Sequence, residues 1–579
     1  MIQTILENLP SDWLDLTTHR LDTYNEKLAK SEFLEKIEAL EEINEKTLAE
    51  LPTAFDYIRL GHPLSCLLEL DLAKKSGLKA ESVISFSSQT MPIMAVLRKN
   101  KFKKIKTRIV YTNELPQNFN PEIIKSVYEY NFELVKVESL ADLKSFDGHT
   151  LAINGDHNTN ANTIVNLYPK LGSVIQVLDQ DLEYIREIQH VRRRESIAMT
   201  PHNCLKLLRG ETPTDIKIDP APLIKTIQSI THTTTPVSLG SCGLSVQYAI
   251  MMGLVHHAKE NHPNKPIRFI VPPNCYGGTN DQARRVATCV ENVEIIDLPV
   301  DSGKNMVTEL ERILVEVSKI NAIPYVIAEI PTNPRVEIPD LVKLAEVLKN
   351  PSNPVFILDQ TFCPNVNFFG EDGFLNDVSA ISYVSGSKFP SGGLCTAGYG
   401  VANDNASQYM KYINDHLILC DNTATDLQVD ILTAQMPSMN ERIAKAYENT
   451  RGFVDYIQEC LPEAKINFVS HELANLTFTP SVFSLDLPTK GDTHEEREEY
   501  KKVLNHTLIR MMIDTIPDES KHCVSYGQLK GCYWTIPATS TQGTTKESDK
   551  DYIVRVSIGP GFNLEKHKDV FKEFCESII

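Results

Sequence analysis

The chain has 579 residues, of which 42% are hydrophobic and 23% charged, as in an ordinary globular protein. Its formal net charge is -18, and an acidic surface repels the phosphates of nucleic acid, so nucleic-acid binding is not expected. No stretch approaches the ~20 apolar residues of a membrane helix, the N-terminus lacks a signal-peptide pattern, and the 12 cysteines show no metal-ligand spacing. We therefore expect a cytoplasmic protein without membrane contact or bound metal.

The spacing of apolar residues predicts the secondary structure in chain order. Residues 1 to about 50 are predicted to be helical, most clearly at 31–51. From about 80 to 190, and again from about 236 to 387, short apolar runs alternate with helical stretches, which predicts parallel strands with crossover helices. The runs lie at 82–86, 107–111, 150–154, 173–179, 236–240, 267–273, 293–299, 325–330, 355–360 and 379–387.

Past about 425 the pattern changes to long helical stretches, separated strands at 481–488 and 552–559, and a charged final helix. These shifts predict an N-terminal α/β domain at 1–190, a large doubly wound, mostly parallel α/β domain at 191–425, and a small α+β domain at 426–579. The basic segment at 190–196 is interpreted as the first boundary. A basic cluster at 99–106 is interpreted as a solvated helix end.

Lys388 lies in a Ser/Gly-rich segment directly after an apolar strand. A lysine forms a Schiff base with an aldehyde only when its amine is neutral, and partial desolvation at a strand end lowers the pKa of such an amine. Ser385 and Ser387 could donate hydrogen bonds to a phosphate. By itself, a lysine in such a loop is more often a solvated loop residue.

Three further positions change that balance. Asp359 ends an apolar run and is expected at the carboxyl end of a strand, where ligands of α/β sheets bind. Tyr276 precedes two glycines, which would let its ring lie over a ligand, and Gly243 and Leu244 open a helix whose N–H groups suit a phosphate. Each has an ordinary structural interpretation, as a turn aspartate, a packed tyrosine or a turn glycine.

In order along the chain, these residues resemble the Cys/Met-metabolism (trans-sulfuration) family of fold-type I enzymes that use pyridoxal 5'-phosphate (PLP). The family includes cystathionine γ-synthase and the cystathionine lyases. The resemblance covers about 200–579 and rests on the segments YGGT (276–279), EIPTNP (329–334), LDQT (358–361), SGSK (385–388), VRVSIG (554–559) and 523–542.

The resemblance implies a role for each matching residue. Lys388 would be the Schiff-base lysine and proton carrier, Asp359 the partner of the pyridine nitrogen, and Tyr276 the ring that stacks on the cofactor. Asn333 would bind the ring hydroxyl, and Gly243, Leu244, Ser385, Ser387 and Arg209 the phosphate. Arg555 would bind the substrate carboxylate through a two-pronged contact, with Ser525 nearby.

The chain departs from the family pattern at Leu207, where the family has a tyrosine, and at Cys242, where it has a serine. Lys530 and Gln542 replace a glutamate and a histidine near the substrate side chain. These last two departures leave the PLP chemistry intact but leave substrate and reaction open.

Residues 1–190 carry an echo of the same pattern. Tyr57 and Arg59 precede Pro63 at the spacing that Arg209 shows to Pro213, and VLDQ (177–180) parallels ILDQ (357–360). No strand-end lysine follows Asp179, so one interpretation is a degenerate, truncated repeat. The alternative is that any two α/β segments share strand-end polar residues. If the repeat is real, Tyr57 and Arg59 would bind the phosphate in the role of the family tyrosine whose position is occupied here by Leu207.

The sequence thus predicts a PLP-dependent enzyme of carbon–sulfur chemistry, in the form of a homo-oligomer acting on a small amino acid. The first expectation is γ-replacement on an O-acylhomoserine, as in cystathionine γ-synthase. The alternatives are a β- or γ-lyase of cystathionine or methionine, and a non-catalytic protein with a PLP-enzyme fold.

Overall fold

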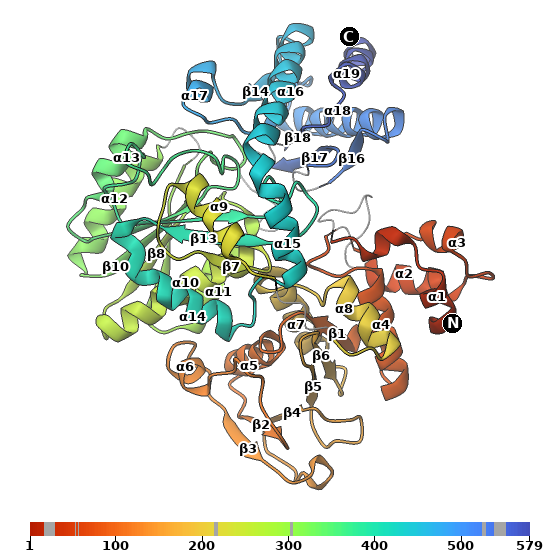
Figure 1. Ribbon diagram of the computed structural model, residues 1–579. Helices are drawn as coiled ribbons and strands as arrows, with labels where there is room; N and C mark the ends of the chain where they lie inside the picture. Colours follow the sequence, from red (N-terminus) through yellow and green to blue (C-terminus); the bar gives the residue numbers. More distant parts are fainter. Residues whose placement is uncertain are drawn as a thin grey trace.

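Three β-sheets follow one another along the chain, each with its own helices (Figure 1). The computed structural model describes residues 1–16, 29–52, 54–55, 57–213, 218–300, 305–523, 528–537 and 552–578. Within these ranges no helix is long and apolar enough to cross a membrane.

The N-terminal part begins with short helices and continues into a six-stranded sheet of order β1-β6-β5-β4-β2-β3. Strands β2 to β5 run parallel, and β6 is antiparallel to both β5 and β1. The elements are α1 (Ile2–Glu7), α2 (Ala29–Glu38), α3 (Glu45–Ala49), α4 (Pro63–Ser76), β1 (Val83–Phe86), α5 (Met91–Lys103), β2 (Thr107–Tyr111), α6 (Pro121–Ser126), β3 (Glu133–Lys136), β4 (His149–Ile153), β5 (Thr163–Tyr168), β6 (Gly172–Val177) and α7 (Leu182–Glu195).

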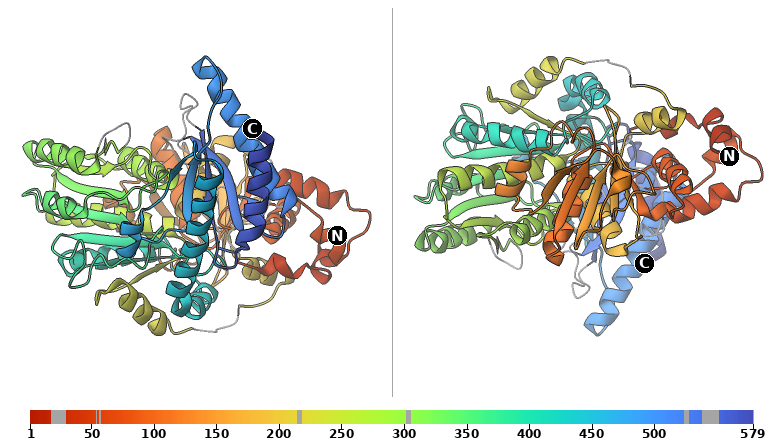
Figure 2. Two further views of the ribbon diagram at one scale, coloured as in Figure 1. Left: turned by 90° about the horizontal axis from the view of Figure 1, so that it is seen from above. Right: turned by 90° about the horizontal axis from the view of Figure 1, so that it is seen from below.

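The middle part is a seven-stranded sheet of order β7-β13-β12-β11-β10-β8-β9, in which only β13 is antiparallel to its neighbours. Helices lie on both of its faces (Figure 2). The elements are α8 (Pro201–Arg209), α9 (Ala221–Thr231), β7 (Ser238–Gly240), α10 (Gly243–Asn261), β8 (Ile267–Val271), α11 (Gly277–Cys289), β9 (Val293–Asp297), α12 (Met306–Lys319), β10 (Ile323–Glu329), α13 (Leu341–Leu348), β11 (Val355–Asp359), β12 (Ala380–Ser385), β13 (Gly398–Ala402) and α14 (Met410–Leu419).

The C-terminal part is a five-stranded sheet of order β14-β15-β18-β17-β16 with long helices on it. Its elements are α15 (Asp426–Gln435), α16 (Met439–Cys460), β14 (Lys465–Asn467), α17 (His471–Asn475), β15 (Val482–Asp486), α18 (His494–Thr515), β16 (Ser520–His522), β17 (Gly531–Pro537), β18 (Tyr552–Ser557) and α19 (Leu564–Ile578). Short 3₁₀ helices lie at Ser11–Leu14, Ala80–Ser82, Leu140–Asp142, Asp404–Tyr409 and Met436–Ser438.

The predicted α/β architecture, a large mostly parallel sheet followed by a smaller α+β unit, is confirmed. The expectation that the strands run parallel is wrong for β6, because a tight turn after β5 folds it back on that strand. The antiparallel β13 was not among the predicted strands, and it leaves the middle sheet mostly parallel, as predicted. The single helix predicted at 31–51 is broken. A new helix starts after Asn44, whose side chain accepts the N–H of Thr47 while the Thr47 hydroxyl accepts the N–H of Asn44.

One hydrophobic core joins the first two sheets. It contains Ile84 and Ile109 from the N-terminal sheet together with Phe269 from the middle sheet and Ile413 from α14. The basic segment expected to be a boundary forms the end of α7, which packs against α10. The first two parts of the chain are therefore packed together through a continuous interior.

Candidate active site

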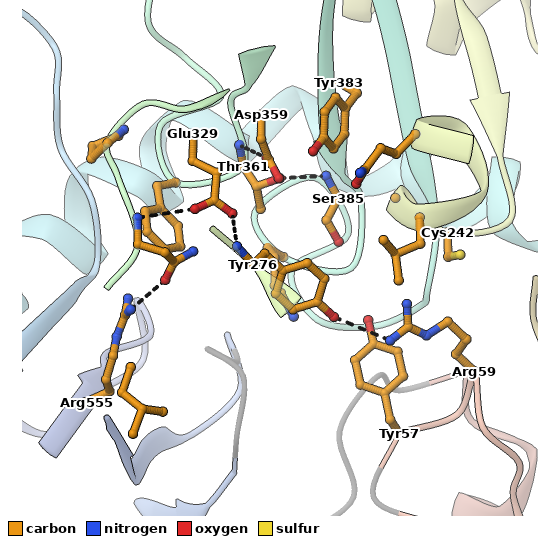
Figure 3. Close-up of a pocket in the computed structure, with 18 of the residues that line it drawn as sticks. Tyr57, Arg59, Cys242, Tyr276, Glu329, Asp359, Thr361, Tyr383, Ser385 and Arg555 are labelled. Carbon is orange, nitrogen blue, oxygen red and sulfur yellow. Dashed lines mark hydrogen bonds between the residues drawn. The ribbon is translucent and has the colours of Figure 1, made fainter. Parts of the chain in front are cut away.

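A pocket opens at the carboxyl ends of β10, β11 and β12 and at the start of α10, with one wall from the N-terminal part and one from β17 and β18 (Figure 3). Parallel strands deliver the side chains at their carboxyl ends to one edge of the sheet, which is where ligands bind in α/β folds. The pocket therefore combines residues from all three parts of the chain.

The Lys388 amine lies in this pocket, in the loop that joins β12 to β13. The residue is 6% exposed, and its Nζ lies 5.7 Å from the centre of the Tyr57 ring. Burial disfavours the charged amine and lowers the pKa of Lys388 to about 8. The structure thus excludes the alternative that Lys388 is a solvated loop residue, and its burial favours the neutral amine relative to an ordinary lysine.

Two carboxylates face the same space. Asp359 ends β11 and Glu329 ends β10, and the two residues are register partners in adjacent strands. Burial raises the pKa of both carboxyl groups, and the neighbouring Asp359 charge raises that of Glu329 further. Asp359 Oδ1 accepts the Thr361 N–H at 3.0 Å, while Glu329 accepts the N–H groups of Tyr276 at 2.8 Å and Asn333 at 3.2 Å.

At one end of the pocket, the N-terminus of α10 lies close to the end of β12, an arrangement that suits an anion. Gly243 is the first residue of α10, and Cys242 caps the helix by accepting the Ser245 N–H. A Cβ on Gly243 would lie 3.0 Å from the Ser385 Cα, so only glycine allows the helix start to come this close to the end of β12. The first turn of α10 thereby lies beside Ser385 and the pocket.

Tyr57 and Arg59 reach this end from the segment before α4 (Figure 3). The Tyr57 hydroxyl donates to Ser387 Oγ at 3.3 Å, and Arg59 Nη2 donates to the Tyr276 hydroxyl at 3.5 Å. Within the described residues, the buried Arg59 Nε has no hydrogen-bond partner. Burial alone would raise the pKa of Tyr276, but the Arg59 and Arg194 guanidinium groups outweigh it and lower that pKa.

Arg555 forms the opposite end of the pocket (Figure 3). It lies on β18, is 2% exposed, and donates from Nη1 to the Asn333 side-chain oxygen at 2.6 Å. The rings of Phe362 and Trp534 lie 5.6 and 5.8 Å from its guanidinium carbon. A buried guanidinium held in this way can bind a carboxylate through two parallel hydrogen bonds.

The structure brings together most of the residues expected from the sequence. These are Tyr57, Arg59, Gly243, Leu244, Tyr276, Asn333, Asp359, Ser385, Lys388 and Arg555, with Ser387 directly behind Tyr57. Arg209 is not among them: it ends α8, its side chain is 43% exposed, and it donates to the Leu6 carbonyl. Ser525 and Gln542 lie outside the described residues.

Several lining residues were not expected from the sequence. Glu329 and Thr361 belong to recognised segments, and their place at strand ends could have identified them. Gln247 and Tyr383 carry no such signal, and Trp534 reaches the pocket only because β17 pairs with β18.

No protein-family model matches the chain, and no curated protein matches it. Among solved structures, the cystathionine γ-synthase of Xanthomonas oryzae pv. oryzae in complex with cystathionine is 16% identical, with a TM-score of 0.46, over 64% of this chain and 90% of that one. The apo methionine γ-lyase CalE6 of Micromonospora echinospora is 14% identical, with a TM-score of 0.45, over 60% and 83%. A third similar structure, metB of Corynebacterium glutamicum, is 17% identical, with a TM-score of 0.46, over 64% and 90%. Likenesses this distant carry no conclusion about the chemistry of this chain.

Proposed function

We propose that this chain is a PLP-dependent enzyme acting on a sulfur-type amino acid, with Lys388 as the lysine that binds the cofactor. The observation that carries the proposal is one pocket that holds a buried amine and has a cationic group at each end. Lys388 lines this pocket together with Arg59 at the α10 end and Arg555 at the β18 end. PLP with an amino acid attached presents a phosphate and a carboxylate, which call for two such ends.

The residues present fit the cofactor. At one end, Arg59 carries a buried Nε without a partner among the described residues, beside the start of α10, where backbone N–H groups favour a phosphate. Asp359 offers a buried carboxylate that a cationic pyridine nitrogen would keep ionised. The Tyr276 ring lines the space between. When bound in such a site, PLP acts as an electron sink for carbanions next to its imine.

The protein side chains would divide the remaining work. Arg555 would bind the substrate α-carboxylate and fix which Cα bond faces Lys388. Lys388, with its lowered pKa, would take the Cα proton and return it. The buried Trp534 and Phe362 would exclude water around the substrate.

Within this class, the resemblance to trans-sulfuration enzymes favours γ-replacement on an O-acylhomoserine, in which a thiol sulfur replaces the acyloxy group at Cγ and that group leaves as a carboxylate. A β- or γ-lyase of cystathionine or methionine is the second candidate. Lys530, expected near the substrate, is not among the residues that line the pocket, and its amine donates to the Pro517 carbonyl at 2.9 Å. A homo-oligomer in the cytoplasm stays a prediction.

One set of measurements tests the proposal. The protein is incubated with PLP, reduced with borohydride and mapped, and a pyridoxyl label on the Lys388 peptide is expected. Product analysis with an O-acylhomoserine and cysteine then separates the reactions, because replacement yields cystathionine whereas elimination yields a 2-oxo acid and ammonia. A label on a different lysine, or no label at saturating PLP, contradicts the assignment.

A further inference from the structure

The first two sheets share one topology. If β11 is left out of the middle sheet, the two sheets have the same strand order. The strand directions also agree, because β6 in the N-terminal sheet and β13 in the middle sheet are each antiparallel to both neighbours. The helices that follow correspond too, since α5 packs against α7 as α10 packs against α14. The N-terminal and middle parts of the chain, called the two halves below, thus share one topology. The N-terminal half lacks the strand that ends in Asp359.

The ends of β1 and β7 correspond residue by residue. The Ser87 N–H donates to the Ile197 carbonyl after α7, and the Ser241 N–H donates to the Asn422 carbonyl after α14. The next residue caps the following helix turn in both halves: Ser88 Oγ accepts the Met91 N–H, and Cys242 accepts the N–H three residues on. Gln89 in the N-terminal half therefore occupies the position of Gly243.

The N-terminal half has lost its own pocket in two places. The loop that carries Lys388 is replaced by a tight turn at 169–171, where Tyr168 and Gly172 are paired across β5 and β6. The anion position at the start of α5 is filled by the Asp421 carboxylate, which accepts the Gln89 N–H at 2.7 Å and the Asn118 amide at 3.2 Å. A phosphate and a lysine-bound aldehyde have no place there.

The sequence pairing of VLDQ with ILDQ is corrected by this correspondence. Asp179 follows the antiparallel β6 and is exposed, whereas Asp359 ends a parallel strand. The two aspartates are therefore not equivalent.

What the N-terminal half does contribute is the missing wall of the Lys388 pocket. The half-buried Tyr57 contacts Ser387, the buried Arg59 contacts Tyr276, and the shared core holds the two halves together. A buried cross-half polar group reinforces this: Arg98 of α5 pairs with Glu195 and donates to the Tyr248 hydroxyl of α10 at 3.1 Å. Tyr57 and Arg59 therefore reach the pocket from the same chain that carries Lys388.

We propose that the N-terminal half is a degenerate copy of the middle one and completes the Lys388 site in cis, so that each chain binds one PLP in a site needing no second copy. This rests on the proposed function. A second chain could still bind elsewhere without contributing to the pocket.

The test mixes two full-length variants carrying different tags, Lys388→Ala and Arg59→Ala. The complex bearing both tags, or the simple mixture if none forms, is titrated with PLP and trapped with borohydride at Lys388. In cis, every intact lysine shares a chain with the altered arginine, so affinity stays weakened, about tenfold or more for a lost charge-assisted bond. Half of the sites recovering wild-type affinity would overturn the proposal.

Controls separate the possible failures. Arg59→Lys keeps the charge and should give intermediate affinity even if Arg59→Ala folds poorly, and Arg209→Ala should bind like wild type because Arg209 lies outside the pocket. Wild type should trap one PLP per chain, also at dilutions where light scattering shows monomers. Loss of binding on dilution, or weakened binding in Arg209→Ala alone, refutes completion in cis. A wild type that never labels Lys388 instead refutes the proposed function.

Discussion

Arg555→Lys tests whether the β18 end of the pocket binds the substrate carboxylate. The guanidinium spends Nη1 on Asn333 at 2.6 Å and is confined between two aromatic rings, so its orientation is set before substrate arrives. A lysine ammonium is a point charge without the planar fork. It cannot keep the Asn333 contact and also bind a carboxylate with two parallel bonds, so one charge-assisted bond is lost.

Such a bond is worth about 1.5–3 kcal/mol, which corresponds to a rise in KM of about tenfold to a hundredfold. The assay is steady-state kinetics on the amino-acid substrate, with PLP affinity measured separately and expected to stay within about twofold because Arg555 lies at the end away from Arg59. Arg451→Lys is the matched control, since Arg451 lies in the same part of the chain but outside the pocket. An unchanged KM in Arg555→Lys would show that the carboxylate binds elsewhere.

The remaining predictions concern the amine, the carboxylate and the packing. Lys388→Ala should abolish turnover and borohydride labelling, and residual labelling elsewhere in the chain would contradict the assignment. The pKa of Lys388 is about 8 in the folded protein against an ordinary 10.5, so the unfolded chain binds more protons between these two values. The free energy of unfolding of the cofactor-free protein, measured with denaturant, should therefore rise as the pH rises from about 8. Lys388→Met should lack this slope. Asp359→Asn should keep PLP bound but lower kcat by at least about tenfold, since a neutral amide cannot hold the pyridine nitrogen protonated; an unchanged kcat would exclude that role. Gly253→Ala should destabilise the protein by about 1–3 kcal/mol in thermal unfolding, because its Cβ would lie 2.8 Å from the Ile413 backbone nitrogen where α10 crosses α14; no loss would mean that the helices separate freely.

Much of the fold was predictable because strand and helix periods are local. The predicted runs 107–111 and 355–360 match β2 and β11 to within one residue. Strands missed by the sequence, such as β5 and β13, begin or end at turns whose pairing depends on the preceding strand. The antiparallel direction of β6 follows from the tight turn after β5, and that of β13 from the loop that returns from β12; apolar spacing reports neither.

The candidate site divides in the same way. Lys388 and Asp359 were identified from the sequence because each follows or ends an apolar strand, whereas Arg555 was identified through the family resemblance of the segment 554–559. Arg209 was expected to bind phosphate because its segment resembles a family motif, yet it ends α8 with its side chain 43% exposed and lies outside the pocket. Spacing along the chain does not specify which of two similar arginines faces the pocket.

The sequence by itself therefore determined the α/β class, the strand positions and the reactive residue types, because these depend on neighbours a few positions away. Only the tertiary structure decided that Tyr57 meets Ser387 across 330 positions, and that Asp421 closes the corresponding place in the N-terminal half. These contacts exist because burying one shared core brings the two halves together, and that packing free energy is a property of the whole chain.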